Sequence, residues 1–273
     1  MSANPIHADW ANRVVVLTGA SSGIGRALAL ALAKRGARLV LAARDETALA
    51  EVAEACRLGG GEARAVPTDV TEPEDCGRLV AASVAAFGRI DVLVNNAGGT
   101  MIARLDEVTD VSLYDRLTRL NYLSAVHLTW HALPHLERTS GLIVVMASLQ
   151  SFLALPTRTG YTAAKHAVFG FFEALRLELR GTGVDVTIVA PDWVATEAHH
   201  RALGPDGRPF GRSLLVSSKV MTAEACALLT IRAMERRTPL VITSLRGRIA
   251  RVARVLVPRV VDWFVLRAMA RGH

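Results

Sequence analysis

The sequence predicts an α/β fold built on one doubly wound parallel β-sheet of about seven strands, with helices on both faces. Two observations carry this prediction. Short apolar runs alternate with segments of helical pattern over residues 13–242, and the first apolar run leads into a glycine-rich turn. The 273 residues are enough for one large domain, and the sequence contains neither internal repeats nor an interior linker.

Each predicted strand is a short, mostly apolar run, as expected for strands that a parallel sheet buries on both faces. The strands are expected at residues 13–17, 38–43, 63–67, 90–94, 142–146, 184–189 and 239–242.

The predicted helices begin and end at residues that favour helix boundaries. They are expected at residues 26–35, 45–58, 71–87, 113–133, 157–179 and 222–236. Gly36 stops the first helix. Asp45 caps the second and Thr71 the third. Pro134 bends or ends the long fourth helix, because proline removes a backbone hydrogen bond.

Composition places the chain among globular proteins of a reducing compartment. Hydrophobic residues make up 51% of it, and its three cysteines lack the spacing of a metal site or a disulfide framework. Residues 1–9 are polar and show no signal segment, and no apolar run approaches the ~20 residues of a spanning helix. We therefore expect a cytoplasmic protein.

The C-terminal residues differ in composition from the rest. Seven arginines and one acid, Asp262, lie between positions 246 and 271, so most of the net charge of +7 belongs to this tail. We expect a domain at residues 1–244, a basic amphipathic extension at residues 245–273, and no nucleic-acid partner. Arginines interleaved with Trp263 and Phe264 favour peripheral contact with a membrane surface. A subunit contact or a cover over the substrate cleft remain alternatives.

A proton-transfer site is predicted just after the strand at 142–146. Tyr161 and Lys165 are four residues apart on a predicted helix, so they share one face. A nearby ammonium favours the phenolate and lowers the pKa of a phenol. Ser148, at the end of the strand, can reach the same point with its hydroxyl. The three side chains suit a proton donor, the cation that tunes it, and a holder for a substrate oxygen.

A dinucleotide site is predicted at the first strand-to-helix turn. Glycines at 19, 23 and 25 let a pyrophosphate approach the backbone and the N-terminus of the following helix. The second strand ends at Arg44 instead of a carboxylate. An arginine there can pair with a ribose 2′-phosphate, so NADP(H) is favoured over NAD(H).

With these motifs in order, residues 13–196 resemble the classical short-chain dehydrogenase/reductase (SDR) family. Thr18 to Gly25 (TGASSGIG) matches the family's glycine motif, and Asn95 to Gly98 (NNAG) matches the motif after its fourth strand. The resemblance implies a Rossmann-like fold and a catalytic tetrad of Asn121, Ser148, Tyr161 and Lys165. It also implies that Lys165 holds the nicotinamide ribose and that Asn121 binds a water relaying protons to solvent.

The resemblance further implies a set of cofactor contacts, in which Asp69 and Val70 hold the adenine and residues 191–196 approach the nicotinamide. The expected cofactor-binding residues are Gly19, Ser21, Ser22, Gly23, Ile24, Gly25, Arg44, Asp69, Val70, Asn96, Ala97, Gly98, Tyr161, Lys165, Pro191, Val194 and Thr196. One position departs from the family pattern: Asp192 stands where a glycine is usual, and a positive φ there would suit aspartate less well.

The predicted activity is hydride transfer between NADP(H) and a lipophilic ketone or secondary alcohol. The expected substrate contacts are Ser148, Gln150, Phe152, Leu153 and Trp193. Two alternatives remain: a catalytically silent dinucleotide-binding or membrane-associated scaffold, and another SDR chemistry such as epimerisation or dehydration. The intact tetrad argues against a scaffold. We expect no metal, and the family resemblance implies a homodimer or homotetramer.

Overall fold

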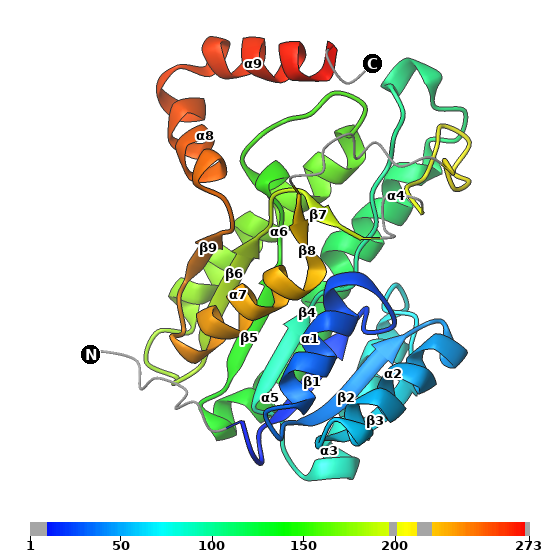
Figure 1. The fold of residues 1–273 in the computed structure, drawn as a ribbon, viewed down its shortest axis with the longest axis vertical. Coiled ribbons are helices and arrows are strands. Elements are labelled where there is room, and N and C mark those ends of the chain that lie inside the picture. The colour runs from blue at the N-terminus through cyan, green and yellow to red at the C-terminus, as the bar shows by residue number, and fades with distance from the viewer. Residues whose placement is uncertain (1–9, 197–200, 212–219, 271–273) are drawn as a thin grey trace.

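A computed structural model describes residues 10–196, 201–211 and 220–270 and confirms the doubly wound sheet. Seven parallel strands lie in the order β3-β2-β1-β4-β5-β6-β9, with helices on both faces (Figure 1). The strands are β1 (Val14–Thr18), β2 (Arg38–Ala43), β3 (Glu62–Pro67), β4 (Val92–Asn95), β5 (Leu142–Met146), β6 (Asp185–Ala190) and β9 (Leu240–Ile242). A separate two-stranded parallel pair joins β7 (Val194–Ala195) to β8 (Met221–Thr222).

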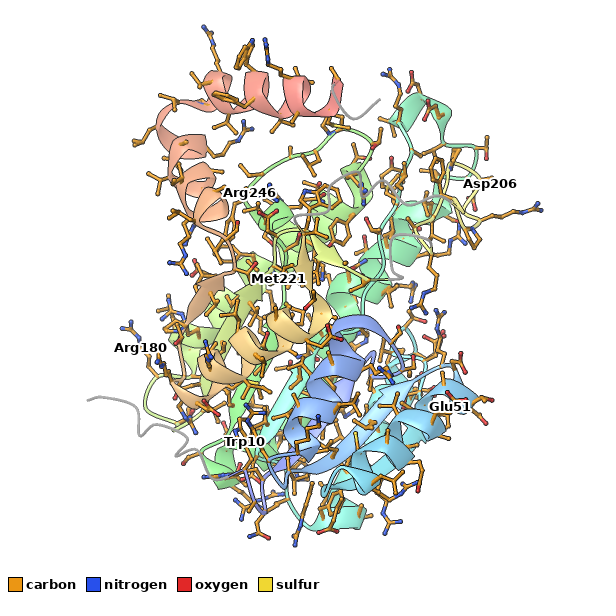
Figure 2. The ribbon with its side chains drawn as sticks, viewed as in Figure 1. Trp10, Glu51, Arg180, Asp206, Met221 and Arg246 are labelled. Atoms are coloured by element: carbon orange, nitrogen blue, oxygen red, sulfur yellow. The ribbon has the colours of Figure 1, made fainter. Side chains whose placement is uncertain are left out.

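Two layers of helices bury the sheet. Helices α1 (Gly23–Ala33), α2 (Glu46–Leu58) and α7 (Ala223–Glu235) contribute to the core on one face. Helices α3 (Pro73–Phe87), α5 (Ser124–Thr139) and α6 (Thr159–Glu178) contribute to the core on the other. Every residue of β1 and β5 is buried, which explains their continuous apolar sequences. Trp10, at the base of the molecule in Figure 2, is wholly buried and donates a 3.0 Å hydrogen bond to Glu235.

The expected long helix at 113–133 is three consecutive segments, and Pro134 does not end it. They are α4 (Ser112–Thr118), a π-helical turn η2 (Arg119–Leu123) and α5, which contains Pro134 and continues to Thr139. The predicted end at Pro134 was wrong because proline costs one hydrogen bond, whereas the buried Leu128, Ala132 and Leu136 stabilise α5 on both sides of it.

The predicted helix boundaries are partly confirmed. Asp45 caps α2, and its carboxylate accepts a 3.0 Å hydrogen bond from the backbone N–H of Ala48. Thr71 does not cap α3, since its hydroxyl donates to Asp69 and the helix begins at Pro73. Proline suits this first position because the lost N–H has no helical partner there. Gly36 adopts a left-handed φ of +81° in the turn between α1 and β2.

Two short helices follow β9: α8 (Leu245–Leu256) and α9 (Pro258–Ala270), the orange and red segments of Figure 1. They extend from the end of the molecule opposite α3. Three shorter elements complete the described chain: η1 (Leu105–Glu107), η3 (Leu149–Ser151) and α4. Among the described helices, none combines the length and apolarity needed to cross a bilayer.

Candidate active site

The predicted site residues come together at the carboxyl edge of the sheet. Parallel strands all end at the same edge, so the segments that follow β1, β4, β5 and β6 lie close together there. The residues between β5 and α6 supply Ser148, and the first two turns of α6 supply Tyr161 and Lys165.

Asn121 reaches this edge from the π-helical turn η2. Its amide nitrogen donates to the carbonyls of Gly99 (2.9 Å) and Leu117 (3.0 Å), and its oxygen accepts from the Gly99 N–H (3.2 Å). A Cβ at Gly98 would lie 2.9 Å from the Asn121 oxygen and 3.6 Å from Lys165 Nζ. Glycine at 98 therefore leaves room for these two side chains to approach each other.

Lys165 is a buried cation, 4% exposed. Its ammonium donates a 2.7 Å hydrogen bond to the carbonyl of Met146, at the end of β5. Burial lowers the pKa of Lys165 to about 8. The ammonium lies 5.8 Å from the centroid of the Tyr161 ring, so the predicted pairing of these two residues is present.

The electrostatics of Tyr161 differ from the prediction. Burial raises the pKa of its phenol above the ordinary value, and a hydrogen bond with Ser148 and the charge of Arg158 lower it only part of the way back. The Lys165 ammonium lies beside the ring, and its effect on the phenol pKa stays a prediction. Sequence reasoning missed Arg158, because burial of an arginine has no local sequence signal.

The glycine motif is tied to the segment after β4. The Thr18 hydroxyl accepts hydrogen bonds from the N–H groups of Asn96 (3.0 Å) and Ala97 (3.1 Å). The Asn96 amide in turn donates to the carbonyls of Thr18 (2.8 Å) and Gly19 (3.2 Å). A Cβ at Gly25 would collide with the Gly19 carbonyl oxygen, so close packing requires glycine there.

The N-terminus of α1 is suited to a pyrophosphate. Its N-cap residue, Ser22, makes no side-chain hydrogen bond to the first turn, which leaves that end of the helix to an anion. A Cβ at Gly23 would lie 3.3 Å from Thr196, so the residues expected to approach the nicotinamide lie against the same turn. Arg201 Nη2 donates to the Ser22 hydroxyl (2.6 Å). No sequence motif marks Arg201, and sequence analysis did not identify it.

The residues predicted to hold the adenosine lie after β2 and β3, at the carboxyl edge of the sheet. Arg44 directly follows β2, is exposed, and forms no hydrogen bond or ion pair within the described part of the chain. Asp69 accepts from the backbone N–H and hydroxyl of Thr71, and Val70 beside it is buried. The Arg44 guanidinium is thus available to a ligand.

The predicted substrate residues other than Ser148 differ in their surroundings. Leu153 is buried and Trp193 is half-buried. Gln150 instead accepts a hydrogen bond from the Thr162 hydroxyl (3.2 Å). Phe152 packs edge-to-face on Phe169 and carries the Arg251 guanidinium over its ring at 4.8 Å. The roles of these side chains toward substrate stay predictions.

Asp192 has a role that the sequence did not reveal. It is not among the described residues with a left-handed φ, so its backbone is unstrained. Its carboxylate accepts from the Ser244 hydroxyl (2.7 Å), Arg246 Nε (2.5 Å) and the Trp193 N–H (2.9 Å). Burial would raise the pKa of Asp192, but these hydrogen bonds outweigh it and hold the pKa below its usual value. Asp192 therefore ties the segment after β6 to the start of α8, where Figure 2 labels Arg246.

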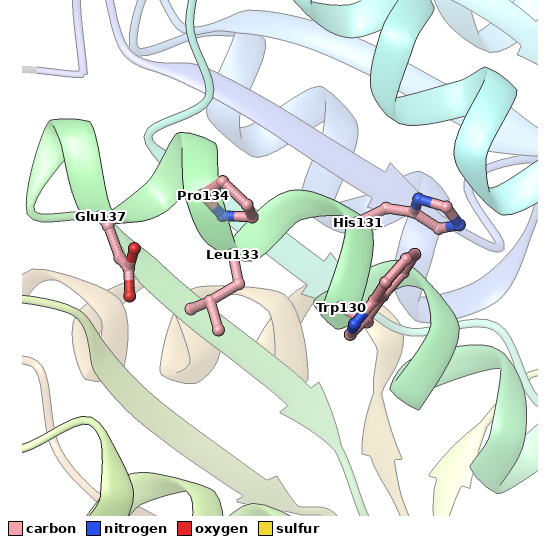
Figure 3. Close-up of a pocket in the computed structure, with 5 residues that line it drawn as sticks. All are labelled: Trp130, His131, Leu133, Pro134 and Glu137. Atoms are coloured by element: carbon pink, nitrogen blue, oxygen red, sulfur yellow. The ribbon is translucent and has the colours of Figure 1, made fainter.

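A surface pocket on α5 lies apart from these residues. It is lined by Trp130, His131, Leu133, Pro134 and Glu137 (Figure 3). None of the tetrad lines it, and Trp130 is 72% exposed. Across the described ranges, no group of three or more His, Cys, Asp or Glu residues is arranged so that it could hold a metal ion.

Comparisons with known proteins define the class. A family model described as short chain dehydrogenase matches residues 13–204. The chain is 38% identical to 11-beta-hydroxysteroid dehydrogenase A of Sesamum indicum, over 96% of this chain and 76% of the relative. It is 36% identical to 11-beta-hydroxysteroid dehydrogenase 1A of Arabidopsis thaliana, over 92% and 74%.

Two solved structures have the same fold. An SDR from Burkholderia phymatum in complex with NAD superposes with a TM-score of 0.81 at 28% identity, covering 92% of this chain and 96% of that one. An alcohol dehydrogenase from Thermococcus sibiricus with 5-hydroxy-NADP gives 0.72 at 26%, covering 84% and 95%. The chain therefore belongs to the short-chain dehydrogenase/reductase family. It is an oxidoreductase of hydroxyl or carbonyl groups that uses a nicotinamide dinucleotide.

We expect Asp192→Asn to loosen the start of α8. Hydrogen exchange of residues 245–250 should quicken by about fivefold, or ~1 kcal/mol, because Arg246 is 67% exposed and the ion pair is partly screened. The lowered pKa predicts that this link persists at neutral pH and is lost only as the pH falls below about 4.

The matched control is Glu62→Gln, which removes the exposed ion pair between Glu62 on β3 and Arg38 on β2 and should leave exchange in α8 unchanged. Unchanged exchange in the Asp192→Asn protein as well would show that the carboxylate does not hold α8.

Proposed function

We propose that the protein is an NADP(H)-dependent oxidoreductase that transfers a hydride between nicotinamide and a lipophilic ketone or secondary alcohol. Tyr161 is the proton donor and acceptor. The observation that carries the proposal is the buried ammonium of Lys165, which donates a 2.7 Å hydrogen bond to the Met146 carbonyl and lies 5.8 Å from the centroid of the Tyr161 ring.

Each side chain has a role in this chemistry. When bound, the nicotinamide supplies or accepts the hydride. The Ser148 hydroxyl positions the substrate oxygen, and Tyr161 gives it a proton as negative charge develops there; oxidation follows the reverse path. Lys165 holds the nicotinamide ribose. Both side-chain N–H groups of Asn121 are bonded to carbonyls, so a relay water would bind to the side-chain or backbone oxygen of this residue.

The preference for NADP(H) rests on Arg44. Its exposed guanidinium, next to the end of β2 and unpaired within the described ranges, can bind a 2′-phosphate through two parallel hydrogen bonds. The remaining contacts at the glycine motif suit either dinucleotide.

The lipophilic substrate is supported by the apolar side chains of Leu153 and Trp193, which are expected to contact it, and by the names of the similar hydroxysteroid dehydrogenases. The silent scaffold and the epimerase or dehydratase remain the competing candidates. We also propose a homodimer or homotetramer, for which the exposed Trp130 beside the pocket on α5 offers an apolar contact.

For residues 245–273 we propose an extension of the 1–244 domain that binds a membrane surface peripherally. Apolar side chains on both helices face solvent instead of the domain: Leu245, Ile249, Val252, Val255, Leu256, Val260, Trp263, Phe264 and Leu266 are all exposed. Arg251 packs inward on Phe152 and Phe169, which turns the apolar stripe of α8 outward. Exposed apolar groups rimmed by arginines match an anionic lipid surface.

Tyr161→Phe tests the proposed chemistry. Turnover of a panel of ketones, steroid ketones included, followed by NADPH depletion, should fall by about 10²–10⁴-fold because a general acid is lost. NADPH binding, followed by fluorescence, should stay within about twofold. Tyr122→Phe is the control, since Tyr122 packs on Phe171 and should keep activity. Wild-type turnover in Tyr161→Phe would contradict the assigned donor, and no NADPH consumption by the wild type would favour the competing candidates.

Arg44→Ser tests the cofactor preference. The KM for NADPH should rise about tenfold with little change for NADH, because a charge-assisted bond to the phosphate is lost. Arg64→Ser, which removes an exposed arginine from the neighbouring strand β3, should change neither KM. Equal KM values for NADPH in the Arg44→Ser and wild-type proteins would assign the preference to other residues.

The double variant Trp263→Ser, Phe264→Ser tests membrane contact in the full chain. Pelleting with phosphatidylserine-containing vesicles should drop at least tenfold, since each buried aromatic ring contributes about 1.5–3 kcal/mol. Leu58→Ser, at an exposed apolar residue of α2, should pellet like the wild type. Equal pelleting of the wild type and a chain ended at Ser244 would remove the membrane proposal. A changed sedimentation coefficient without vesicle binding would indicate a subunit contact.

A further inference from the structure

The side chain of Arg201 lies at the glycine turn, although the residue belongs to the segment that follows β7. Its Nη2 donates a 2.6 Å hydrogen bond to the hydroxyl of Ser22. Ser22 is the N-cap residue of α1, so this contact places a guanidinium at the end of the helix where the pyrophosphate is expected. The glycine motif itself, residues 18–25, contains no cationic side chain. Arg201 therefore brings a positive charge to a turn that has none of its own.

The N-terminus of α1 has backbone donors that suit an anion. The first hydrogen bond of the helix runs from the Arg26 N–H to the Ser22 carbonyl (3.1 Å). The N–H groups of Gly23, Ile24 and Gly25 come before it and have no acceptor within the helix. The aligned peptide dipoles also make this end of the helix positive. A guanidinium beside a positive helix end is unfavourable by itself, whereas an anion between the two is attracted by both.

Backbone contacts hold the segment that carries Arg201. The Leu203 N–H donates to the Thr100 carbonyl (2.9 Å), and the Leu203 carbonyl accepts from the Ile102 N–H (2.8 Å). Ala202, which joins Leu203 to Arg201, is wholly buried. These contacts fix the chain next to Arg201 against the segment after β4, at the carboxyl edge of the sheet.

A second residue beyond β7 lies against the same turn. A Cβ at Gly23 would be 3.3 Å from the Thr196 side chain, and Gly23 is the first residue of α1. Thr196 directly follows β7, and Arg201 comes five positions later. Two separate contacts therefore bring the chain beyond β7 to the cofactor turn.

We propose that Arg201 binds the pyrophosphate of the nicotinamide dinucleotide, together with the backbone N–H groups at the N-terminus of α1. A guanidinium suits this ligand because its planar fork of N–H donors can bond two phosphate oxygens at once. The inference deepens the proposed function, since it rests on a dinucleotide bound at the glycine motif. It concerns a group that NADP(H) and NAD(H) share, whereas Arg44 is proposed to bind the 2′-phosphate that only NADP(H) carries.

Binding of both dinucleotides to Arg201→Gln tests the inference without requiring turnover. The Kd for NADPH and the Kd for NADH, followed by fluorescence, should each rise about tenfold, because a charge-assisted hydrogen bond from an exposed arginine is lost. Arg44→Ser should raise only the Kd for NADPH. The matched control is Arg208→Gln, which removes an arginine of the same segment that pairs with Asp206 (4.0 Å; Figure 2) and should change neither Kd.

Two further measurements separate a direct contact from a structural role. ADP-ribose, which keeps the diphosphate and lacks the nicotinamide, should lose affinity for Arg201→Gln by the same factor as NADH in a competition assay. In about 1 M NaCl the Debye length is ~3 Å, so the loss for NADH should shrink because an exposed charge is screened. Arg201→Lys should raise the Kd for NADH about threefold, since an ammonium keeps the charge without the fork.

Equal Kd values for NADH in the wild-type and Arg201→Gln proteins would overturn the inference. A loss for NADH that ADP-ribose does not show would also overturn it, because the contact would then lie at the nicotinamide. A loss that salt leaves unchanged would indicate a structural role and reject the inference as well. If circular dichroism shows that Arg201→Gln does not fold, a wild-type Kd for NADH in Arg201→Lys would decide against it.

The same measurements distinguish this inference from the proposed function. A wild-type protein that binds both dinucleotides through Arg201 but reduces no ketone would leave the inference standing and reject the proposed function. A protein that reduces ketones with NADPH, and whose Kd for NADH does not depend on Arg201, would keep the proposed function and reject the inference.

Discussion

The desolvation of charge at the carboxyl edge of the sheet is the constraint on which the candidate active site depends. A lysine ammonium loses its hydration when it is buried, and the Met146 carbonyl at the end of β5 replaces part of it. That hydrogen bond fixes the ammonium beside the Tyr161 ring. The same burial lowers the pKa of Lys165 and raises that of Tyr161, so both groups are less charged than they would be in water.

A site that disfavours charge requires nearby groups that stay charged. A bound dinucleotide would bring charge to the edge where the glycine motif and Thr196 meet. The π-helical turn that carries Asn121 packs closely against the same edge of the sheet. It supplies an amide that makes two hydrogen bonds to Gly99 in the segment after β4 and one to Leu117 on α4, and Gly98 leaves room beside Lys165.

The C-terminal helices are connected to this site instead of being an independent tail. Asp192, which follows β6 near the expected nicotinamide contacts, binds Ser244 and Arg246 at the start of α8. Arg251 then packs on the aromatic pair of Phe152 and Phe169. The presence of Asp192 in place of the usual glycine therefore has a structural explanation. The Asp192 carboxylate joins the segment after β6 to a helix whose apolar face is exposed.

The sequence by itself determined the order of strands and helices, the glycine turn and the shared face of Tyr161 and Lys165, because these follow from short-range periodicity and backbone preference. Only the tertiary structure decided that Pro134 lies within a helix, that Arg158 is buried, that Asp192 binds α8, and that the phenol pKa is raised. Each of these depends on atoms contributed by distant segments. Desolvation sums over all neighbouring atoms, and no local pattern of residues specifies that sum.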